Sequence, residues 1–271
     1  MTTVLKEMLN KRSFEAAEAY SKNNDIQVHY GKTLAITADI KGGDKILDMG
    51  CGTGELTSFL GEIVGREGQV VGVDPDFGRI QYAKQKHLSV NIVVFEHGDS
   101  STEFIQRNKS YYDVHFSNFV FQWLSPERKK EFVRVAFESL KRGGVIAIQS
   151  HQETPCVMKQ VEQMISNDQP FSLCKKDEVN IRPLPFFMNK SETESILRDC
   201  GFEIISNDFY LETYRYATIR DFVNFVVASD YHESEMLSLN AFKMFAELFG
   251  NDDGSVDFFD PTVYQIVAKK T

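Results

Sequence analysis

Three glycines alternate with other residues directly after an apolar run in the segment 46–54, Ile-Leu-Asp-Met-Gly-Cys-Gly-Thr-Gly. An amphipathic segment follows, in which apolar residues recur at i, i+3, i+4 and i+7 from Leu56. A second apolar run, 70–73, then ends in Asp74. This succession of strand, glycine turn, helix, strand and carboxylate is typical of the nucleotide-binding half of a doubly wound fold. The glycines let the backbone approach a ligand closely, and Asp74 can accept both hydroxyl groups of a ribose.

The residue after the third glycine narrows the choice of nucleotide. The dinucleotide fingerprint is G-x-G-x-x-G, but here the glycines read G-x-G-x-G and Glu55 stands where a further glycine is required. A phosphate at this helix start would meet a carboxylate, which Coulomb repulsion disfavours. The sequence also has no G-x-x-x-x-G-K-[ST] run for a nucleoside triphosphate. A dinucleotide and a nucleoside triphosphate are therefore both disfavoured.

Two further predicted strands end in residues that could contact a ligand. The strand 91–96 runs into Gly98-Asp99, and the strand 112–117 runs into Asn118 and later Trp123, the single tryptophan. The carboxyl ends of strands form the ligand-binding edge of an open α/β sheet. Asp99 is thus a candidate ligand contact, although ordinary turn chemistry explains a Gly-Asp pair equally well by itself.

Helices are expected between these strands, at 77–86 and after Ser125-Pro126, which supply an N-cap and a first helical residue. The triplet Arg142-Gly143-Gly144 is expected to close the second of these helices before a fifth strand at 145–149. Residues 1–40 are expected to be helical, and the turn at 41–44 leads into the first strand. The repeated alternation of strand and helix predicts a parallel sheet.

The alternation stops after residue 150. A helix is expected at 155–165, followed by a proline-containing loop, and Ser191 with Glu194 forms a capping-box pattern for a helix that ends at Cys200-Gly201. The segments 201–206 and 263–268 look like the last two strands. The stretch 214–261 between them is much longer than a hairpin needs, so it predicts a two-helix lid or substrate cap.

The glycine segment resembles the first motif of the class I S-adenosylmethionine-dependent methyltransferases, whose ligand carries an adenosine and an amino acid but no phosphate. The resemblance implies an α/β protein with a doubly wound, seven-stranded, mostly parallel sheet, the Rossmann-like methyltransferase fold, with its last two strands antiparallel and a mainly helical cap. It divides the chain into an N-terminal arm over the cofactor site (1–40), a cofactor-binding core (41–150), and the remaining strands (151–271) with the cap inserted at about 211–261.

The same resemblance implies the cofactor S-adenosylmethionine, released as S-adenosylhomocysteine, with no metal. Asp99 would accept a hydrogen bond from the adenine amino group, and the residues around Asn118 would lie beside the methyl group. The cofactor-binding set that it implies is Tyr20, Asp48, Gly50, Cys51, Gly52, Gly54, Asp74, Pro75, Asp99, Ser100, Asn118 and Phe119.

A closer resemblance rests on the segments 20–27 and 121–124 and the Gly143-Gly144 turn. They look like the insect juvenile hormone acid methyltransferases and are similar to the trans-aconitate methyltransferases. In the first family a helix glutamine and this tryptophan are taken to hold the acceptor carboxylate, which implies that role for Gln27 and Trp123. The expected reaction is O-methylation of a small carboxylic acid to its methyl ester by in-line transfer. The aromatic C-terminal region suits an acceptor with an apolar tail, although it cannot be matched to the family residue by residue.

Two other functions stay open. Methylation of a small amine or phenol needs a base, and the candidates are His151 after the fifth strand and His115 within the fourth. A protein that binds S-adenosylmethionine without catalysis is the second alternative. A nucleic-acid methyltransferase is disfavoured because the sequence has no N/D-P-P-Y motif after the fourth strand.

The composition fits a small-molecule enzyme. The 271 residues carry a net charge of −9, so neither nucleic acid nor an anionic membrane is an expected partner. The four cysteines have no C-x-x-C spacing, which argues against a zinc site, and the N-terminus has no apolar run of a signal peptide. The expectation is a cytoplasmic monomer or homodimer that acts on a small-molecule acceptor.

Overall fold

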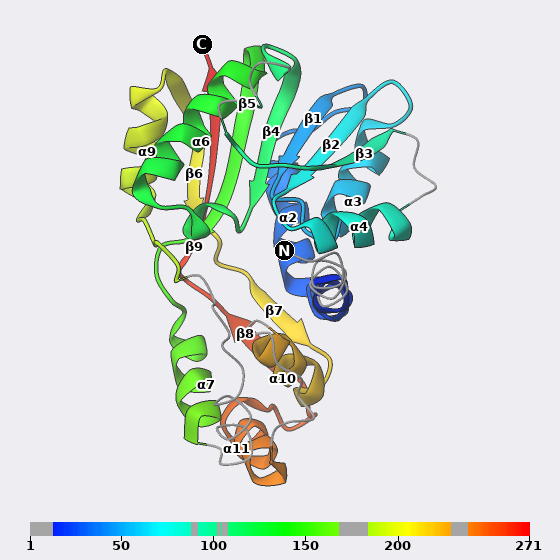
Figure 1. Cartoon of the computed structure of the whole chain (residues 1–271). Coiled ribbons are helices and arrows are strands. Elements are labelled where there is room, and N and C mark those ends of the chain that lie inside the picture. Colours follow the sequence, from blue (N-terminus) through cyan, green and yellow to red (C-terminus); the bar gives the residue numbers. More distant parts are fainter. Residues whose placement is uncertain (1–12, 88–91, 102–103, 105–107, 168–183, 229–237) are drawn as a thin grey trace, which may run out of the picture.

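The computed structural model describes residues 13–87, 92–101, 104, 108–167, 184–228 and 238–271. A seven-stranded sheet forms the centre of the larger part of the molecule, with strands in the order β3-β2-β1-β4-β5-β9-β6 (Figure 1). Neighbouring strands pair in parallel, except that β9 runs antiparallel to both β5 and β6. The predicted doubly wound, mostly parallel sheet is therefore confirmed, as is its antiparallel last pair.

The chain order of the strands identifies the ligand edge. The strands are β1 (Lys45–Met49), β2 (Gln69–Asp74), β3 (Val93–His97), β4 (Tyr112–Asn118), β5 (Leu140–His151), β6 (Phe202–Phe209) and β9 (Val263–Lys270). The order reverses between β1 and β4, which are neighbours in the sheet. Ligands of such sheets bind beyond the carboxyl ends of the strands at this reversal. The glycine turn follows β1 and Asn118 ends β4, so both lie there.

Helices cover the two faces of the sheet. On one face α2 (Asp25–Thr37) and α3 (Glu55–Val64) pack against strand residues such as Ile46 and Val70, and α4 (Phe77–Lys86) packs against Phe95. On the other face α6 (Pro126–Ser139) and α9 (Lys190–Asp199) share one hydrophobic core with Leu47 and Val71. Successive strand residues thus enter opposite cores, as the period of two in a strand requires.

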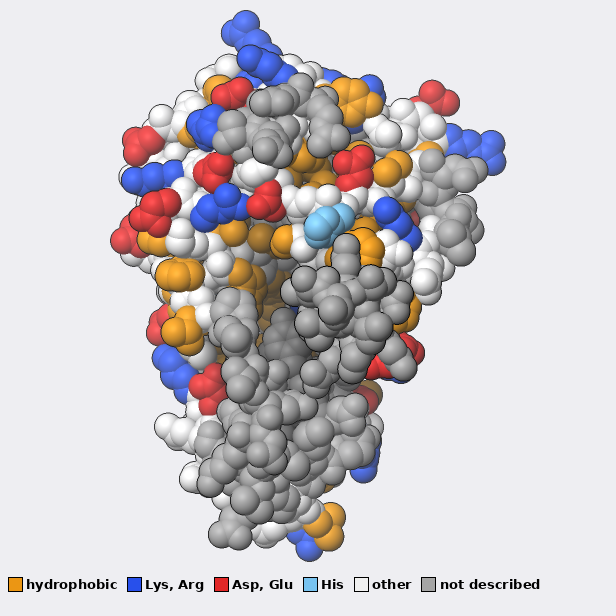
Figure 2. All heavy atoms as spheres, in the orientation of Figure 1, with side chains coloured by type: hydrophobic (Ala, Val, Ile, Leu, Met, Phe, Trp, Pro, Cys, Tyr) orange, Lys and Arg blue, Asp and Glu red, His pale blue; other side chains and the backbone are white. Residues whose placement is uncertain are grey.

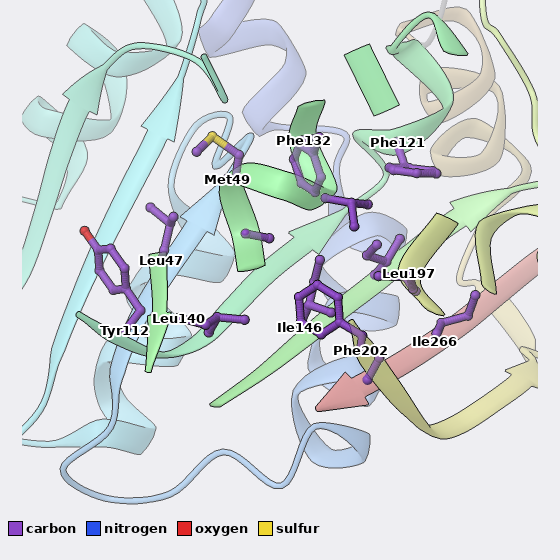
Figure 3. Close-up of a cluster of buried hydrophobic side chains, with 14 of the residues drawn as sticks. Leu47, Met49, Tyr112, Phe121, Phe132, Leu140, Ile146, Leu197, Phe202 and Ile266 are labelled. Carbon is purple, nitrogen blue, oxygen red and sulfur yellow. The ribbon is translucent and has the colours of Figure 1, made fainter. Parts of the chain in front are cut away.

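The core on the α6 side is the one shown in Figure 3. Strand residues from β1, β4, β5 and β9 meet there with Phe132 of α6, Leu197 of α9 and Phe202 of β6. Phe132 and Leu197 are fully buried. Burying such a side chain contributes about 1.5–3 kcal/mol. The core therefore fixes the strands whose carboxyl ends carry the candidate site.

The cap has a core of its own. It consists of α7 (Cys156–Asn167), α10 (Ile219–Ala228), α11 (Leu239–Phe249) and the antiparallel strands β7 (Thr213–Tyr216) and β8 (Val256–Phe259), and it lies beyond the end of the sheet (Figure 1). Buried aromatic residues such as Phe222, Phe245 and Phe258 fill it, and Ile26 and Tyr30 of α2 join them. Helix α2 thus connects the sheet to the cap.

Several local expectations are wrong. The capping box uses Asn189 and Glu192 instead of Ser191 and Glu194, because Asn189 accepts the Glu192 N–H and the Glu192 side chain accepts the Asn189 N–H. Helix α6 ends at Ser139, and the triplet 142–144 lies inside β5, where the pairing with β4 shifts register. The pair β7–β8 was missed, since the predicted cap contained only helices. The proline-containing loop lies largely outside the described residues.

On the face seen in Figure 2, acidic and basic side chains are interspersed over the sheet-bearing part of the molecule. None of the described helices is both long and apolar enough to cross a bilayer. Within the described ranges, no three His, Cys, Asp or Glu side chains gather as a metal site would require.

Candidate active site

The backbone of the glycine turn after β1 favours glycine at all three glycine positions of the motif. Gly50, Gly52 and Gly54 have φ angles of +86°, +56° and +88°, in the left-handed region. The Gly50 N–H donates to the carbonyl of Val73 at 2.7 Å, which holds the turn against β2. A side chain at Gly54 would meet the Phe95 ring at 2.7 Å. The turn is therefore built from glycine by necessity.

Asp74, at the end of β2, is buried beside this turn. One of its oxygens accepts the Gly52 N–H at 2.9 Å and the other accepts the Asp76 N–H at 2.8 Å. Burial raises the pKa of the carboxyl group, while Arg79 and the two backbone donors act against burial. Each carboxylate oxygen has a second lone pair. Asp74 can therefore still accept ribose hydroxyl groups, and that role stays a prediction.

Asp48 is buried near the end of β1, where its carboxylate lies against α3. It accepts a hydrogen bond from the Thr57 hydroxyl at 2.7 Å. Burial, with a smaller contribution from the charge of Asp74, raises the pKa of Asp48 to about 7. Burial also raises the pKa of the neighbouring Cys51 thiol, so this cysteine stays protonated. Both side chains are buried next to the glycine turn, and their predicted contact with the cofactor stays a prediction.

The loops after β2 and β3 come together. The ring of His97 contacts the Pro75 carbonyl at 3.0 Å, and the Gly98 N–H donates to the Asp74 carbonyl at 3.1 Å. The Asp99 carboxylate pairs with Arg128 at 2.7 Å, so an adenine amino group would have to share it. The adjacent Ser100 is buried.

The N-terminal segment is tied to the turn through Glu55. Its carboxylate accepts hydrogen bonds from Ser21 at 2.5 Å, Asn24 at 3.0 Å, Thr53 at 2.5 Å and Lys86 at 2.9 Å. Burial acts to raise the pKa of Glu55, but these donors outweigh it and lower the pKa below its usual value. Sequence reasoning used Glu55 only to exclude phosphate and missed this role.

Tyr20 lies over the turn itself. Its ring approaches the position of a Gly52 side chain at 4.0 Å, and the Arg79 guanidinium lies 4.7 Å from the ring centre. Residues 13–21 are helical. The Ser13 hydroxyl donates to Asp76 at 2.7 Å, which ties this helix to the loop after β2. The N-terminal segment therefore borders the predicted cofactor site.

At the end of β4, Asn118 connects three elements. Its side-chain N–H donates to the Gln27 carbonyl of α2 at 2.9 Å, and its oxygen accepts from Gln149 of β5 at 2.6 Å. Phe119 follows with a φ of +56°, which is unusual for a residue other than glycine and marks local strain. The Gln27 side-chain oxygen is buried and has no hydrogen-bond partner among the described residues.

His151, at the end of β5, stacks on Phe119 with ring centres 4.8 Å apart. Its Nδ1 lies 3.1 Å from Asp260 Oδ2 and 3.2 Å from the Thr262 hydroxyl. Tyr30 lies on the other side of the cluster, 5.9 Å from Phe119 and 4.2 Å from Tyr210 between ring centres. Asp260 precedes β9 in a segment with no motif, so sequence reasoning could not find it.

Two predicted residues need separate comment. Trp123 ends the short 3₁₀ helix Phe121–Trp123 and is 38% exposed, so its pairing with Gln27 around a carboxylate stays a prediction. His115 is fully buried in the middle of β4, and burial lowers its pKa to about 3. His115 therefore cannot act as a base at the ligand edge, and the prediction of His115 as a candidate base is wrong.

These residues fit the predicted cofactor. The Asp74 carboxylate and the backbone of the glycine turn can hold an adenosine, and the Gln27 side-chain oxygen and the half-buried Asn118 side chain lie at the end of β4. The charged Glu55 at the start of α3 opposes a phosphate there. The donor set therefore suits an adenosine bearing an amino acid better than a nucleotide bearing phosphates.

The sheet order and the glycine turn are those of the class I S-adenosylmethionine-dependent methyltransferase fold. Residues 46–144 match the family model described as a methyltransferase domain. For this part of the chain, the match agrees with the predicted methyltransferase class.

Curated relatives also carry methyltransferase names. Protein 235L of Invertebrate iridescent virus 6, named as a methyltransferase, is 27% identical over 194 residues, 72% of this chain and 65% of its own length. Demethylmenaquinone methyltransferase of Staphylococcus epidermidis is 34% identical over 133 residues, 48% of this chain and 53% of its own. Trans-aconitate 2-methyltransferase of Afipia carboxidovorans is 26% identical over 159 residues, 55% of this chain and 56% of its own. The chain thus spans about half to two thirds of the length of these relatives.

Solved structures agree on the fold. A S-adenosylmethionine-dependent methyltransferase from Aquifex aeolicus superimposes with a TM-score of 0.56 over 94% of this chain and 98% of its own, at 15% identity. The YcgJ protein of Bacillus subtilis superimposes with a TM-score of 0.54 over 89% of this chain and 98% of its own, also at 15% identity. At this identity the likeness concerns the fold alone.

Proposed function

We propose that the protein transfers the methyl group of S-adenosylmethionine to a carboxylate oxygen of a small acid with an apolar body, giving a methyl ester. The carrying observation is the position of Gln27, whose backbone is bound by Asn118 at the end of β4 and whose buried side-chain oxygen has no hydrogen-bond partner among the described residues. An amide whose oxygen is not held by a donor is free to present its N–H groups to a bound carboxylate.

The chemistry needs no base. S-adenosylmethionine, when bound, supplies an electrophilic methyl group. A carboxylic acid with a pKa near 4 is already an anion at pH 7, so the chain has only to orient it and exclude water. The Gln27 amide can turn its N–H groups toward such an anion, and Trp123 offers a further N–H donor. Neutral donors orient the carboxylate while leaving it nucleophilic.

The walls around this position suit an apolar acceptor. Phe119 and Tyr30 lie together between the sheet edge and the cap, and Tyr210 packs on Tyr30. Trans-aconitate 2-methyltransferase, a relative, is named for an acid, and demethylmenaquinone methyltransferase is named for a different kind of acceptor. The names are compatible with more than one acceptor class, so the acceptor has to be found by experiment.

The test is a panel of carboxylic acids of graded chain length and polarity, scored for methyl esters by mass spectrometry. With the best acid, Gln27→Ala and Trp123→Phe should each lower kcat/KM by about 5- to 100-fold, the loss expected for a hydrogen bond to a charged group. Ile36→Ala, on the 77% exposed face of α2, is the control and should keep full activity. Ester formation that is unaffected by both site variants contradicts the proposal.

A second candidate is methylation of a phenol or amine with His151 as the base, which the position of His151 beside Phe119 and Asp260 favours. Phenols and amines belong in the same panel. Tight cofactor binding with no methylated product from any acceptor would instead support the non-catalytic alternative.

A further inference from the structure

The contacts of His151 fix which of its ring nitrogens carries a proton. The Thr262 hydroxyl donates its only proton to Asp260 Oδ1 at 2.7 Å, so its oxygen can only accept from the His151 Nδ1 that lies 3.2 Å away. Asp260 Oδ2, the other atom near Nδ1, has no further hydrogen-bond donor among the described residues. Nδ1 therefore carries a hydrogen in both charge states, and the charge state is decided at Nε2.

Asp260 is a buried anion. Its side chain is 1% exposed, and burial acts to raise its pKa, but the hydrogen bonds and the charge of His151, together with the Thr262 donors, lower the pKa below its usual value. A buried carboxylate that stays ionised requires a partner, and the His151 ring is the partner beside Asp260. When the ring carries both protons, its Nε2–H is a charged donor on the side of the ring away from Asp260.

The His151 ring lies near the proposed acceptor position. His151 is stacked on Phe119, which follows Asn118, and Asn118 binds the backbone of Gln27. The side chain of His151 is 21% exposed, whereas its partner Asp260 is not accessible. His151, the accessible member of the pair, therefore lies at the same sheet edge as the proposed acceptor.

We propose that His151 binds the carboxylate of the acceptor through Nε2–H as an imidazolium, and that Asp260 is the positioning residue that orients this ring. This inference rests on the proposed carboxyl methylation and adds a charged contact to the neutral donors Gln27 and Trp123. The His151–Asp260 pair has no net charge, so it attracts the carboxylate at close range while leaving the site without an excess positive charge that would weaken the nucleophile.

Among the described residues, a chain of titratable groups continues from Phe119 on the side away from His151: Tyr30, Tyr210, Glu212 and His29. Tyr210 bridges two of them, with its hydroxyl 3.1 Å from His29 and 2.8 Å from Glu212. Burial raises the pKa of Tyr30 well above its usual range, and burial with Glu212 raises that of Tyr210 to about 12, so neither tyrosine ionises between pH 5 and 9. His29 is a second imidazole near the proposed acceptor site, so the effect of replacing it has to be measured separately.

Binding of a simple acid tests the inference without turnover. Octanoate and its uncharged analogue octanamide are titrated by calorimetry into the full chain loaded with S-adenosylhomocysteine, between pH 5.5 and 8.5. The variants are His151→Phe, which keeps a ring against Phe119 but no nitrogen, and Asp260→Asn, which removes the buried charge. His29→Gln is the matched control.

Octanoate should bind about 10- to 100-fold more weakly to His151→Phe and to Asp260→Asn, the loss of one charge-assisted hydrogen bond, while octanamide binds all proteins alike. Octanoate binding to the unaltered protein and to His29→Gln should weaken as the pH rises through the imidazole titration, and this dependence should vanish in His151→Phe.

Equal octanoate affinity and equal pH dependence in His151→Phe and the unaltered protein would overturn the inference, and so would absence of octanoate binding to any of them. A rate with a phenol acceptor that rises with pH and is lost in His151→Phe would also overturn it, in favour of a neutral His151 acting as a base. Ester formation in the acid panel is a separate readout. It can therefore support the proposed function even if this contact is absent.

Discussion

The buried Asp48 makes the free energy of unfolding depend on pH, and this dependence can be measured. In the unfolded chain an aspartate has a pKa near 3.9, whereas burial beneath the glycine turn raises the pKa of Asp48 to about 7. Between these values the folded protein holds a proton that the unfolded chain releases. The free energy of unfolding therefore falls as the pH rises through this window, and the fall levels off above pH 7.

The size of the effect follows from the shift. Each pH unit inside the window costs about 1.4 kcal/mol, so the step from pH 5 to pH 8 costs about 2–3 kcal/mol. Asp48→Asn removes the titration and keeps an oxygen that accepts from Thr57. Its new N–H group costs free energy equally at every pH. The informative quantity is thus the change with pH in the stability difference between variant and parent.

Urea unfolding of both proteins at pH 5 and pH 8, at one ionic strength, measures this quantity. Asp48→Asn should gain about 2–3 kcal/mol relative to the parent between the two pH values. The difference between proteins is needed because Glu55 and Asp260, whose pKa values are lowered, contribute with the opposite sign. Glu67→Gln, at an exposed turn residue, controls for the loss of one charge. A stability difference that is equal at both pH values would refute the reasoning.

Two further predictions concern cofactor binding. Glu55→Gln should speed amide hydrogen exchange around Ser21 and Asn24 and weaken S-adenosylmethionine binding about tenfold, because it removes a charge that several donors share. The control Glu62→Gln, exposed on the same helix, should change neither quantity. Unchanged exchange in Glu55→Gln would contradict the role of Glu55. Asp74→Asn should weaken S-adenosylmethionine binding about 10- to 100-fold by calorimetry with the fold retained by circular dichroism, and an unchanged affinity would argue against ribose at this position.

The features that the sequence predicts well are those set by neighbours in the chain. The spacing of Gly50, Gly52 and Gly54 requires positive φ angles within a few residues, and Ser125-Pro126 begins α6 by a cap that is also local. The strand and helix periods are local as well, and they predict the sheet correctly. The antiparallel pairing of its last two strands was expected only from the family resemblance, and the strand order itself was not predicted.

The predictions fail where contacts between segments far apart in the sequence determine the local structure. Ser191 and Asn189 are both suitable N-caps, and the structure selects Asn189, with Lys190 of the first turn bonded to the carbonyl of Asn207 in β6. Strands β7 and β8 are four residues each and pair with one another across 39 intervening residues, so each alone has too weak a pattern to identify. Asp260 becomes meaningful only beside His151, 109 positions earlier in the chain.

The ligand edge carries several carboxylates, and each is balanced in a different way. Asp48 is balanced by a proton, Asp74 by backbone N–H groups, and Asp260 by His151. S-adenosylmethionine bears a cationic sulfonium, which buried carboxylates and oriented amides stabilise without a metal ion. An acceptor carboxylate, by contrast, must find donors in a site that already holds the anions Asp74 and Asp260. The Gln27 amide and the far end of His151 are groups of the described edge suited to that task, and for this reason the carboxylate proposal depends on them.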